Sequence, residues 1–182
     1  MSKFYAGIGS RETPVAKLFF MAKLAYFLEK DGYTLRSGGA TGADKAFSDG
    51  CKAKEIYVPW EGYNDLPYRY PVPDEAYIVA MNHHPNWERL SNGARKLMAR
   101  NTMQILGPKL DNHSKFVICW TPDGCTSTGE RTSKTGGTGQ AISIATTYNI
   151  PVYNLARPGT DMVVLDTLTA YKEESWETTS EE

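Results

Sequence analysis

Short apolar runs alternate with longer stretches of helical periodicity along most of the chain. Runs rich in β-branched and aromatic residues predict strands at residues 4–8, 33–37, 55–58, 116–120 and 151–155. The stretches between them predict helices at 14–30, 42–50, 74–83, 91–106 and 140–148, and a closing helix or strand at 162–171. This alternation predicts a Rossmann-like α/β fold, with a mainly parallel sheet of five or more strands and helices on both faces.

The helix predicted at 14–30 has an unusual composition. It begins at Thr13 and Pro14, a capping hydroxyl followed by a proline at the first helical position. Polar residues are few, and its aromatic residues point in several directions, so more than one side should be buried. Segment 59–73 or the C-terminal segment could cover it within the chain. We instead predict a homo-oligomer, most simply a two-fold dimer, with this helix at or beside the interface.

Three segments lack a regular pattern. Residues 59–73 are rich in Pro, Tyr, Trp and Asn and predict an irregular excursion. Residues 123–135 contain almost no apolar side chain, which predicts a mobile loop. Residues 172–182 are acidic and predict a flexible tail that follows a single domain at 1–171.

Composition limits the classes of function. The chain has 182 residues, 41% of them hydrophobic, which suits one domain with a good core. Its 20 basic and 21 acidic side chains give a net charge of −1, whereas proteins that bind duplex nucleic acid are usually more basic. The odd count of 3 cysteines argues against a disulfide framework and favours a reducing compartment. With no apolar leader and no membrane-length run, we expect a cytoplasmic protein.

Three glycine-rich turns carry the main functional signal. The turn at 7–11 follows Phe4-Tyr5-Ala6, the turn at 36–44 follows Tyr33-Thr34-Leu35, and the turn at 135–140 opens a helix. Glycine allows close approach of the backbone to a ligand, and a helix that starts after such a turn directs N–H groups and partial positive charge toward it. In parallel sheets such turns meet at the carboxyl edge of the strands, so they predict one anion-binding pocket for a nucleotide or sugar phosphate.

The candidate ligand-binding residues come mostly from these turns. The first turn would hold one part of the ligand, the second would cradle phosphate, and the third would hold a second phosphate or a ribose. The candidates are Gly9, Ser10, Arg11, Arg36, Ser37, Gly38, Gly39, Gly42, Asp44, Arg100, Asn101, Thr121, Gly136, Gly137, Thr138, Gly139 and Gln140. The histidines lack metal-ligand spacing, so we expect no metal and no cofactor.

Several of these residues have a second interpretation. Arg36 could form a salt bridge with Asp44 instead of binding a ligand. Asp44 could act as a helix-capping carboxylate instead of contacting ribose or supplying catalysis. Asn101 lies on the apolar face of the helix at 91–106, so its amide needs a partner, either a ligand or the backbone at a strand end.

The turn motifs resemble the SMF/DprA–LOG (SLOG) superfamily of Rossmann-like proteins. The resemblance covers roughly residues 3–156 and rests on Gly-Ser-Arg, Ser-Gly-Gly-Ala-x-Gly-Ala-Asp and Gly-Gly-Thr-Gly-Gln-Ala. The order, with Lys-Glu-Ile-Tyr-Val-Pro-Trp, Ala-Arg-Asn and Cys-Trp-Thr-Pro-Asp-Gly, looks most like DprA-like proteins of phage genomes. The superfamily includes single-stranded DNA-binding proteins, hydrolases of nucleoside 5′-monophosphates and sensors of nucleotide signals, so the fold alone does not fix the function.

This chain departs from the LOG hydrolase pattern. Those enzymes carry a catalytic glutamate after the third glycine turn, and the matching position here is Ser143. A serine cannot stabilise an oxocarbenium-like centre as a carboxylate does, so an N-glycosidic hydrolase or transferase would need another acid, for which Asp44 or Glu12 is available.

Three functions remain open. The leading hypothesis is binding of a nucleotide or a nucleotide-derived signal, for example one of the ADP-ribose type. In a phage context the use of such binding would be to sequester that signal. The second is hydrolysis of nucleoside monophosphates at the N-glycosidic bond, with Asp44 as the carboxylate. The third is binding of single-stranded DNA through Arg95, Lys96 and Arg100, which the net charge does not favour.

Overall fold

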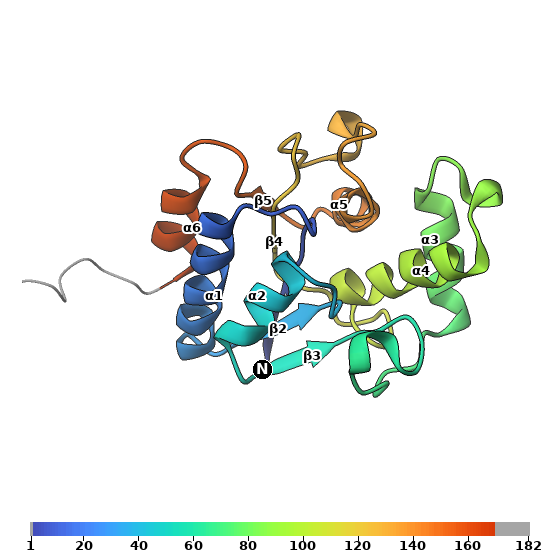
Figure 1. Cartoon of the computed structure of the whole chain (residues 1–182), viewed down its shortest axis with the longest axis horizontal. Helices are drawn as coiled ribbons and strands as arrows, with labels where there is room; N and C mark the ends of the chain where they lie inside the picture. Colours follow the sequence, from blue (N-terminus) through green and yellow to red (C-terminus); the bar gives the residue numbers. More distant parts are fainter. Residues whose placement is uncertain (1, 170–182) are drawn as a thin grey trace, which may run out of the picture.

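Five parallel strands form one sheet at the centre of the molecule (Figure 1). The structure is a computed structural model and describes residues 2–169. The strand order is β3-β2-β1-β4-β5, and every neighbouring pair is parallel. The strands are β1 (Lys3–Gly7), β2 (Tyr33–Ser37), β3 (Lys54–Ile56), β4 (Val117–Cys119) and β5 (Val152–Asn154). The predicted α/β fold with a parallel sheet is confirmed.

Helices cover both faces of this sheet (Figure 1). One face carries α1 (Val15–Lys30), α2 (Ala43–Gly50) and α6 (Thr160–Leu168). The other carries α4 (Asn92–Leu106) and α5 (Thr138–Thr147), with α3 (Asp74–His83) packed on α4. Short 3-10 turns lie at η1 (Tyr63–Asp65), η2 (Trp87–Arg89) and η3 (Thr128–Glu130). No helix within residues 2–169 is long and apolar enough to span a bilayer.

Alternation along the strands builds two cores. Tyr5 and Ile118 pack with α1 and α2, whereas their neighbours Ala6 and Val117 pack with α4 and α5. Successive side chains of a strand point to opposite faces, so strands buried on both faces are mostly apolar, with Arg36 and Ser37 of β2 as buried polar exceptions. This burial explains the short, continuous apolar runs in the sequence.

The chain reverses its direction across the sheet between β1 and β4. From β1 it proceeds outward through β2 to β3, and after α3 and α4 it returns beside β1 as β4. The turns after β1 and β4 therefore separate toward opposite faces at the carboxyl edge. Open α/β sheets bind their ligands in the crevice that such a switch point creates.

Some elements differ from the sequence prediction. Helix α5 begins at Thr138 rather than at residue 140, so the third glycine turn runs directly into it. The closing segment is a helix at Thr160–Leu168, and it packs on α1 with an ion pair of 2.7 Å between Lys17 and Asp161. The tail predicted at 172–182 and the domain end at 171 lie outside the described residues.

Candidate functional site

A cavity of about 790 Å³ opens at the switch point. Nine of the predicted site residues line it: Gly9, Ser10, Arg11, Asp44, Arg100, Asn101, Gly136, Gly137 and Thr138. Eight do not: Arg36, Ser37, Gly38, Gly39, Gly42, Thr121, Gly139 and Gln140. Eleven lining residues are not among the predicted site residues: Ile8, Glu12, Ala40, Tyr63, Leu97, Met98, Gln104, Pro122, Ser133, Lys134 and Thr135.

The first glycine turn presents a cation to the cavity. The Ser10 carbonyl accepts a hydrogen bond of 2.7 Å from the Thr13 hydroxyl, and the Ser10 hydroxyl accepts one of 3.0 Å from the Glu12 amide. A Cβ on Gly9 would lie 2.8 Å from the Ala43 Cβ, so glycine is required here for close packing. The turn is thus rigid, while Arg11 is exposed at the cavity and forms no ion pair within residues 2–169.

The second glycine turn is closed by the protein's own side chains. The Ser37 hydroxyl donates a 2.6 Å hydrogen bond to the Gly7 carbonyl, and Asn64 Nδ2 donates one of 3.0 Å to the Gly39 carbonyl. Asn64 and its neighbour Asp65 both have left-handed backbone angles, with φ of 49° and 58°. Because the segment at 60–66 lies over Gly39, the glycines of this turn do not line the cavity, which the turn reaches at Ala40 and Asp44.

Two buried side chains of α4 hold this helix against the second and third turns. Arg100 Nη1 donates to the carbonyls of Gly38 and Tyr57, the latter at 2.9 Å. Its Nε donates to Asn101 Oδ1 at 3.1 Å, and Asn101 Nδ2 donates to the Gly137 carbonyl at 3.2 Å. The partner that the sequence required for the Asn101 amide is therefore backbone. The Arg100 guanidinium is 5% exposed and cannot serve as an open phosphate contact.

Asp44 is the buried acid of the cavity. Burial raises its pKa to about 6, although the Arg100 charge and backbone N–H groups at Ala40, Gly38 and Gly9 act in the opposite direction. The Ala40 amide donates to its Oδ2 at 3.3 Å. A carboxyl with such a pKa can exchange a proton near neutral pH.

Arg36 does not pair with Asp44, so that interpretation of the sequence is wrong. Leu35 faces α1 and α2, and its neighbour Arg36 therefore points to the other face, away from Asp44. Its Nε lies 3.1 Å from Glu55, its register partner on β3, and its Nη1 donates to the Asn112 carbonyl at 2.5 Å. Arg36 thus connects β2 to the edge strand β3 and to the segment at Asn112, and it does not line the cavity.

The third glycine turn is open to the cavity. Gly136 has φ of 66°, and a Cβ built on it would meet no atom within 4 Å. A Cβ on Gly137 would first meet Met98 Cε at 3.6 Å. By contrast, Gly139 packs against Arg131, and Gln140 Nε2 donates to the Ala80 carbonyl at 2.8 Å. The N-terminus of α5 thus faces the cavity with Gly136, Gly137 and Thr138, whereas Gly139 and Gln140 are packed against the protein.

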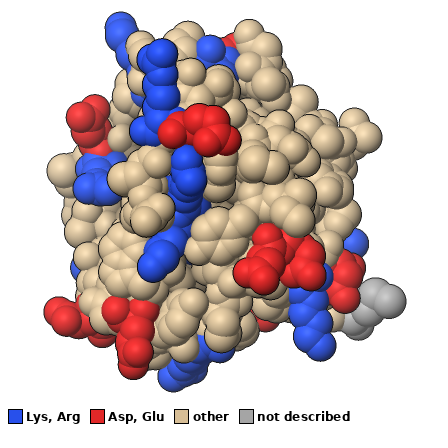
Figure 2. Space-filling view, turned by 90° about the vertical axis from the view of Figure 1, so that its right-hand side faces the viewer, with Lys and Arg blue, Asp and Glu red and all other residues tan. Residues whose placement is uncertain are grey.

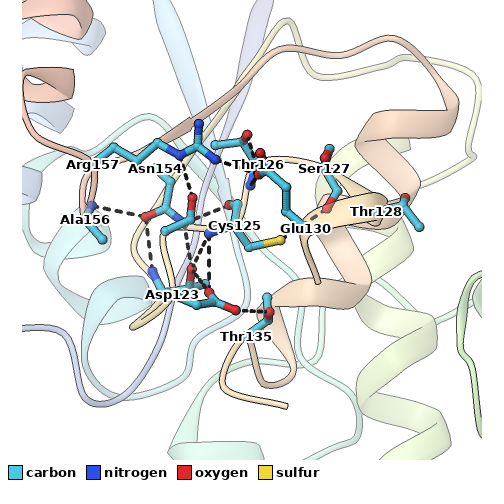
Figure 3. Close-up of polar contacts among 12 residues, drawn as sticks. Asp123, Cys125, Thr126, Ser127, Thr128, Glu130, Thr135, Asn154, Ala156 and Arg157 are labelled. Atoms are coloured by element: carbon cyan, nitrogen blue, oxygen red, sulfur yellow. Dashed lines mark hydrogen bonds and ion pairs between the residues drawn. The ribbon is translucent and has the colours of Figure 1, made fainter. Parts of the chain in front are cut away.

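A hydrogen-bond network fastens the loop before this turn (Figure 3). Asp123 accepts a hydrogen bond of 2.5 Å from the Thr135 hydroxyl, as Figure 3 shows. It also accepts from the hydroxyls of Thr121 and Thr132 at 2.9 and 2.7 Å. Burial acts to raise the pKa of Asp123, but these three hydroxyls and the Cys125 amide outweigh it and lower the pKa to about 2. Asn154 Nδ2 ties Thr121 to β5 at 2.7 Å. The loop predicted to be mobile is held at many points, and Thr121 serves this network rather than the cavity.

Ser143, at the position of the catalytic glutamate of the LOG hydrolases, also lies outside the cavity. Ser143 is buried on α5, where Arg131 Nη1 donates to its hydroxyl at 3.3 Å, and it does not line the cavity. No group of three or more His, Cys, Asp or Glu side chains within residues 2–169 is arranged to hold a metal ion.

One solved protein structure is similar to this fold. The chain matches no protein-family model and no curated protein. It is similar in structure to DNA processing protein A from Helicobacter pylori, with a TM-score of 0.53 and 19% sequence identity. The match covers 90% of this chain and 72% of that protein, whose structural description reports a single-stranded DNA binding mode. At this identity the likeness shows a DprA-like fold.

Proposed function

We propose that the protein binds a nucleotide or a nucleotide-derived signal in the cavity between the first and third glycine turns. The observation that carries this proposal is the open third turn, where Gly136 and Gly137 precede α5 and line the cavity, and where a Cβ on Gly136 would meet no atom within 4 Å. Helix N-termini that follow such turns bind phosphate through backbone N–H groups and the helix dipole. A volume of about 790 Å³ is in the range of sites for small ligands.

Charge at the cavity supports the same ligand class. Arg11 and Lys134 are exposed at its rim, and neither forms an ion pair with a described residue. Two cations beside a helix N-terminus attract an anion, and a guanidinium can bind phosphate oxygens in a bidentate manner. We place the phosphate of the ligand among Arg11, Lys134 and the Gly136–Gly137 turn.

Calorimetry with nucleoside mono- and diphosphates, ADP-ribose and cyclic ADP-ribose isomers tests the proposal. We expect at least one ligand to bind below millimolar, and Arg11→Ala to weaken it about tenfold, as loss of a charge-assisted contact does. Lys52→Ala is the matched control, since Lys52 is exposed and does not line the cavity. A folded sample that binds no member of this panel would refute the proposal.

Single-stranded DNA is the second candidate, because the structural relative is described with such a binding mode. Figure 2 shows Lys and Arg side chains in a line on the face that carries α3 and α4, with acidic side chains beside them. Lys96 of α4 is exposed, whereas Arg95 is half-buried and pairs with Glu88 at 3.6 Å. A mobility shift that weakens steeply with salt and is lost in Lys96→Ala would support this function. No shift at low salt would remove it.

Hydrolysis of the bound nucleotide would require a carboxylate at the cavity, where Asp44 is buried and Glu12 is exposed. Chromatography of nucleoside monophosphates after incubation with the protein distinguishes binding alone from hydrolysis. Intact substrate at high protein concentration supports binding alone, and release of free base that is lost in Asp44→Asn supports a hydrolase.

A further inference from the structure

The cavity has a buried carboxylate in its wall. Of the acidic residues that line it, Glu12 is exposed, whereas Asp44 is 4% exposed. We propose that binding of an anion beside Arg11 is coupled to uptake of a proton by Asp44, so that the protein binds its ligand more tightly as the pH falls. This coupling rests on the proposed function, because it regulates the same phosphate site.

Asp44 lies next to the turn that carries Arg11. A Cβ on Gly42 would lie 2.8 Å from the Cα of Arg11 and 2.9 Å from the Ser10 carbonyl oxygen. The Ala43 amide donates to the same carbonyl at 3.5 Å. The start of α2 therefore packs directly on the first glycine turn, and a phosphate held by Arg11 lies within electrostatic range of Asp44.

The buried guanidinium of Arg100 shows the same proximity. Burial lowers the pKa of Arg100, the Asp44 charge acts to raise it, and the Arg11 charge acts to lower it further. Arg100 thus lies within range of both side chains. The cation that would bind the ligand and the acid that would take up the proton belong to one group of interacting charges.

A buried carboxylate responds strongly to a new charge nearby. Water screens charges on a protein surface, but it screens a buried group much less. At an effective dielectric constant of about 20, two unit charges about 10 Å apart change each other's ionisation equilibrium about tenfold. A ligand anion in the cavity therefore favours the protonated, neutral form of Asp44.

The charged and titratable groups around Asp44 come from several elements. Arg100 of α4 attracts its carboxylate, and the Tyr63 ring of η1 lies 5.8 Å from the Arg100 guanidinium carbon. Arg11, Glu12 and Lys134 also line the cavity. Other charged side chains of α1, α2 and β2 make contacts elsewhere: Lys17 with Asp161, Lys23 with Phe27, Glu29 with the Lys52 amide, Lys30 with Tyr26, Lys45 with Asp49 and Arg36 with Glu55.

Acidification should therefore strengthen binding. In the free protein the pKa of Asp44 is about 6. A ligand anion raises this pKa further, so between about pH 6 and pH 7 the complex binds more protons than the free protein does. A tenfold effect, which places the pKa in the complex at about 7, corresponds to about sevenfold tighter binding at pH 5.5 than at pH 8.

ADP-ribose and inorganic sulfate are suitable probes, because neither changes its charge between pH 5.5 and pH 8. Calorimetry of each probe in buffers of different ionisation enthalpy measures the affinity and the proton uptake together. We expect about half a proton to be taken up per ligand at pH 6.5. For a phosphate monoester such as AMP, whose own second pKa is about 6, the difference between the native protein and Asp44→Asn isolates the contribution of Asp44.

Asp44→Asn keeps the shape of the side chain and removes its titration, so it should take up no proton and bind each probe equally tightly at pH 5.5 and pH 8. Glu12→Gln is the matched control in the same cavity, because Glu12 is exposed and water screens its charge. It should preserve the native proton uptake. Arg11→Ala should weaken the binding of both probes, which identifies the site that is measured.

Three results would refute the coupling while the proposed function stands: native proton uptake in Asp44→Asn, loss of uptake in Glu12→Gln, or tighter binding to the native protein at pH 8 than at pH 5.5. The third would indicate that Asp44 must be ionised to accept a hydrogen bond from a ligand hydroxyl. If neither probe nor any member of the nucleotide panel binds the folded protein, the proposed function fails and the coupling with it.

Discussion

Replacement of Asp44 by asparagine should stabilise the protein at neutral pH. Asp44 is 4% exposed, and burial raises its pKa from 3.8 to about 6 despite the opposing Arg100 charge. A rise of about two pKa units corresponds to about 3 kcal/mol of differential stability between the two protonation states. Asparagine has the same shape, stays neutral at every pH and can still accept from the Ala40 amide.

The direction of the pH dependence follows from linkage. Between about pH 4 and pH 6 the folded protein binds the Asp44 proton more tightly than the unfolded chain does, so the free energy of unfolding falls as pH rises through this window. Above the pKa of Asp44 in the folded protein, the full reduction in the free energy of unfolding is reached. We therefore expect Asp44→Asn to match the native protein near pH 4 and to exceed its stability by up to about 3 kcal/mol at pH 7.

Urea denaturation followed by tryptophan fluorescence from pH 4 to pH 8 measures this difference. Asp49→Asn on the same helix is the control: Asp49 is exposed and pairs with Lys45, so its effect should stay within about 0.5 kcal/mol at all pH values. An Asp44→Asn protein that is less stable than the native one at pH 7 would refute the reasoning. It would mean that attraction to Arg100 outweighs burial of the carboxylate.

Three further predictions address packing, the loop network and assembly. Gly50→Ala places a methyl group on the Ala22 carbonyl of α1 and should cost about 1–3 kcal/mol in urea denaturation, whereas Gly93→Ala meets no atom within 4 Å and should be neutral or stabilising. Asp123→Ala removes the acceptor shared by three threonine hydroxyls and should expose the loop before α5 to limited proteolysis; cleavage at the native rate would contradict the network's role. Phe19 on α1 is 75% exposed, and we predict a dimer by light scattering that Phe19→Glu dissociates; a native mass near 20.2 kDa that does not change on dilution would refute the dimer.

The fold could be predicted from the sequence because its signals are local. The central strands β1 and β4 lie in short apolar runs, and Gly32 and Gly107 follow α1 and α4 with positive φ, which is a common sequence signal for the end of a helix. The intramolecular cover of α1 could not be resolved in advance. Helix α6 packs on one side of it, yet Val15 and Phe19 remain exposed, and the segment at 59–73 lies elsewhere, beside the cavity.

The sequence correctly predicted the first and third glycine turns as parts of the site, because they face the cavity. It did not reveal that another segment of the chain covers the glycines of the second turn. All three turns look alike in sequence, but the second is closed by Asn64 and Leu66 from an irregular segment with no periodicity. Its left-handed residues depend on tertiary contacts that no local pattern encodes.

The face of α4 that lines the cavity fixes the positions of the two glycine turns beside it. Arg100 bonds the second turn, and Asn101 bonds the third, so α4 is fixed relative to both sides of the switch point. A phosphate at Gly136 would therefore meet a cavity wall whose geometry stays constant, and such preorganisation of a site lowers the cost of binding.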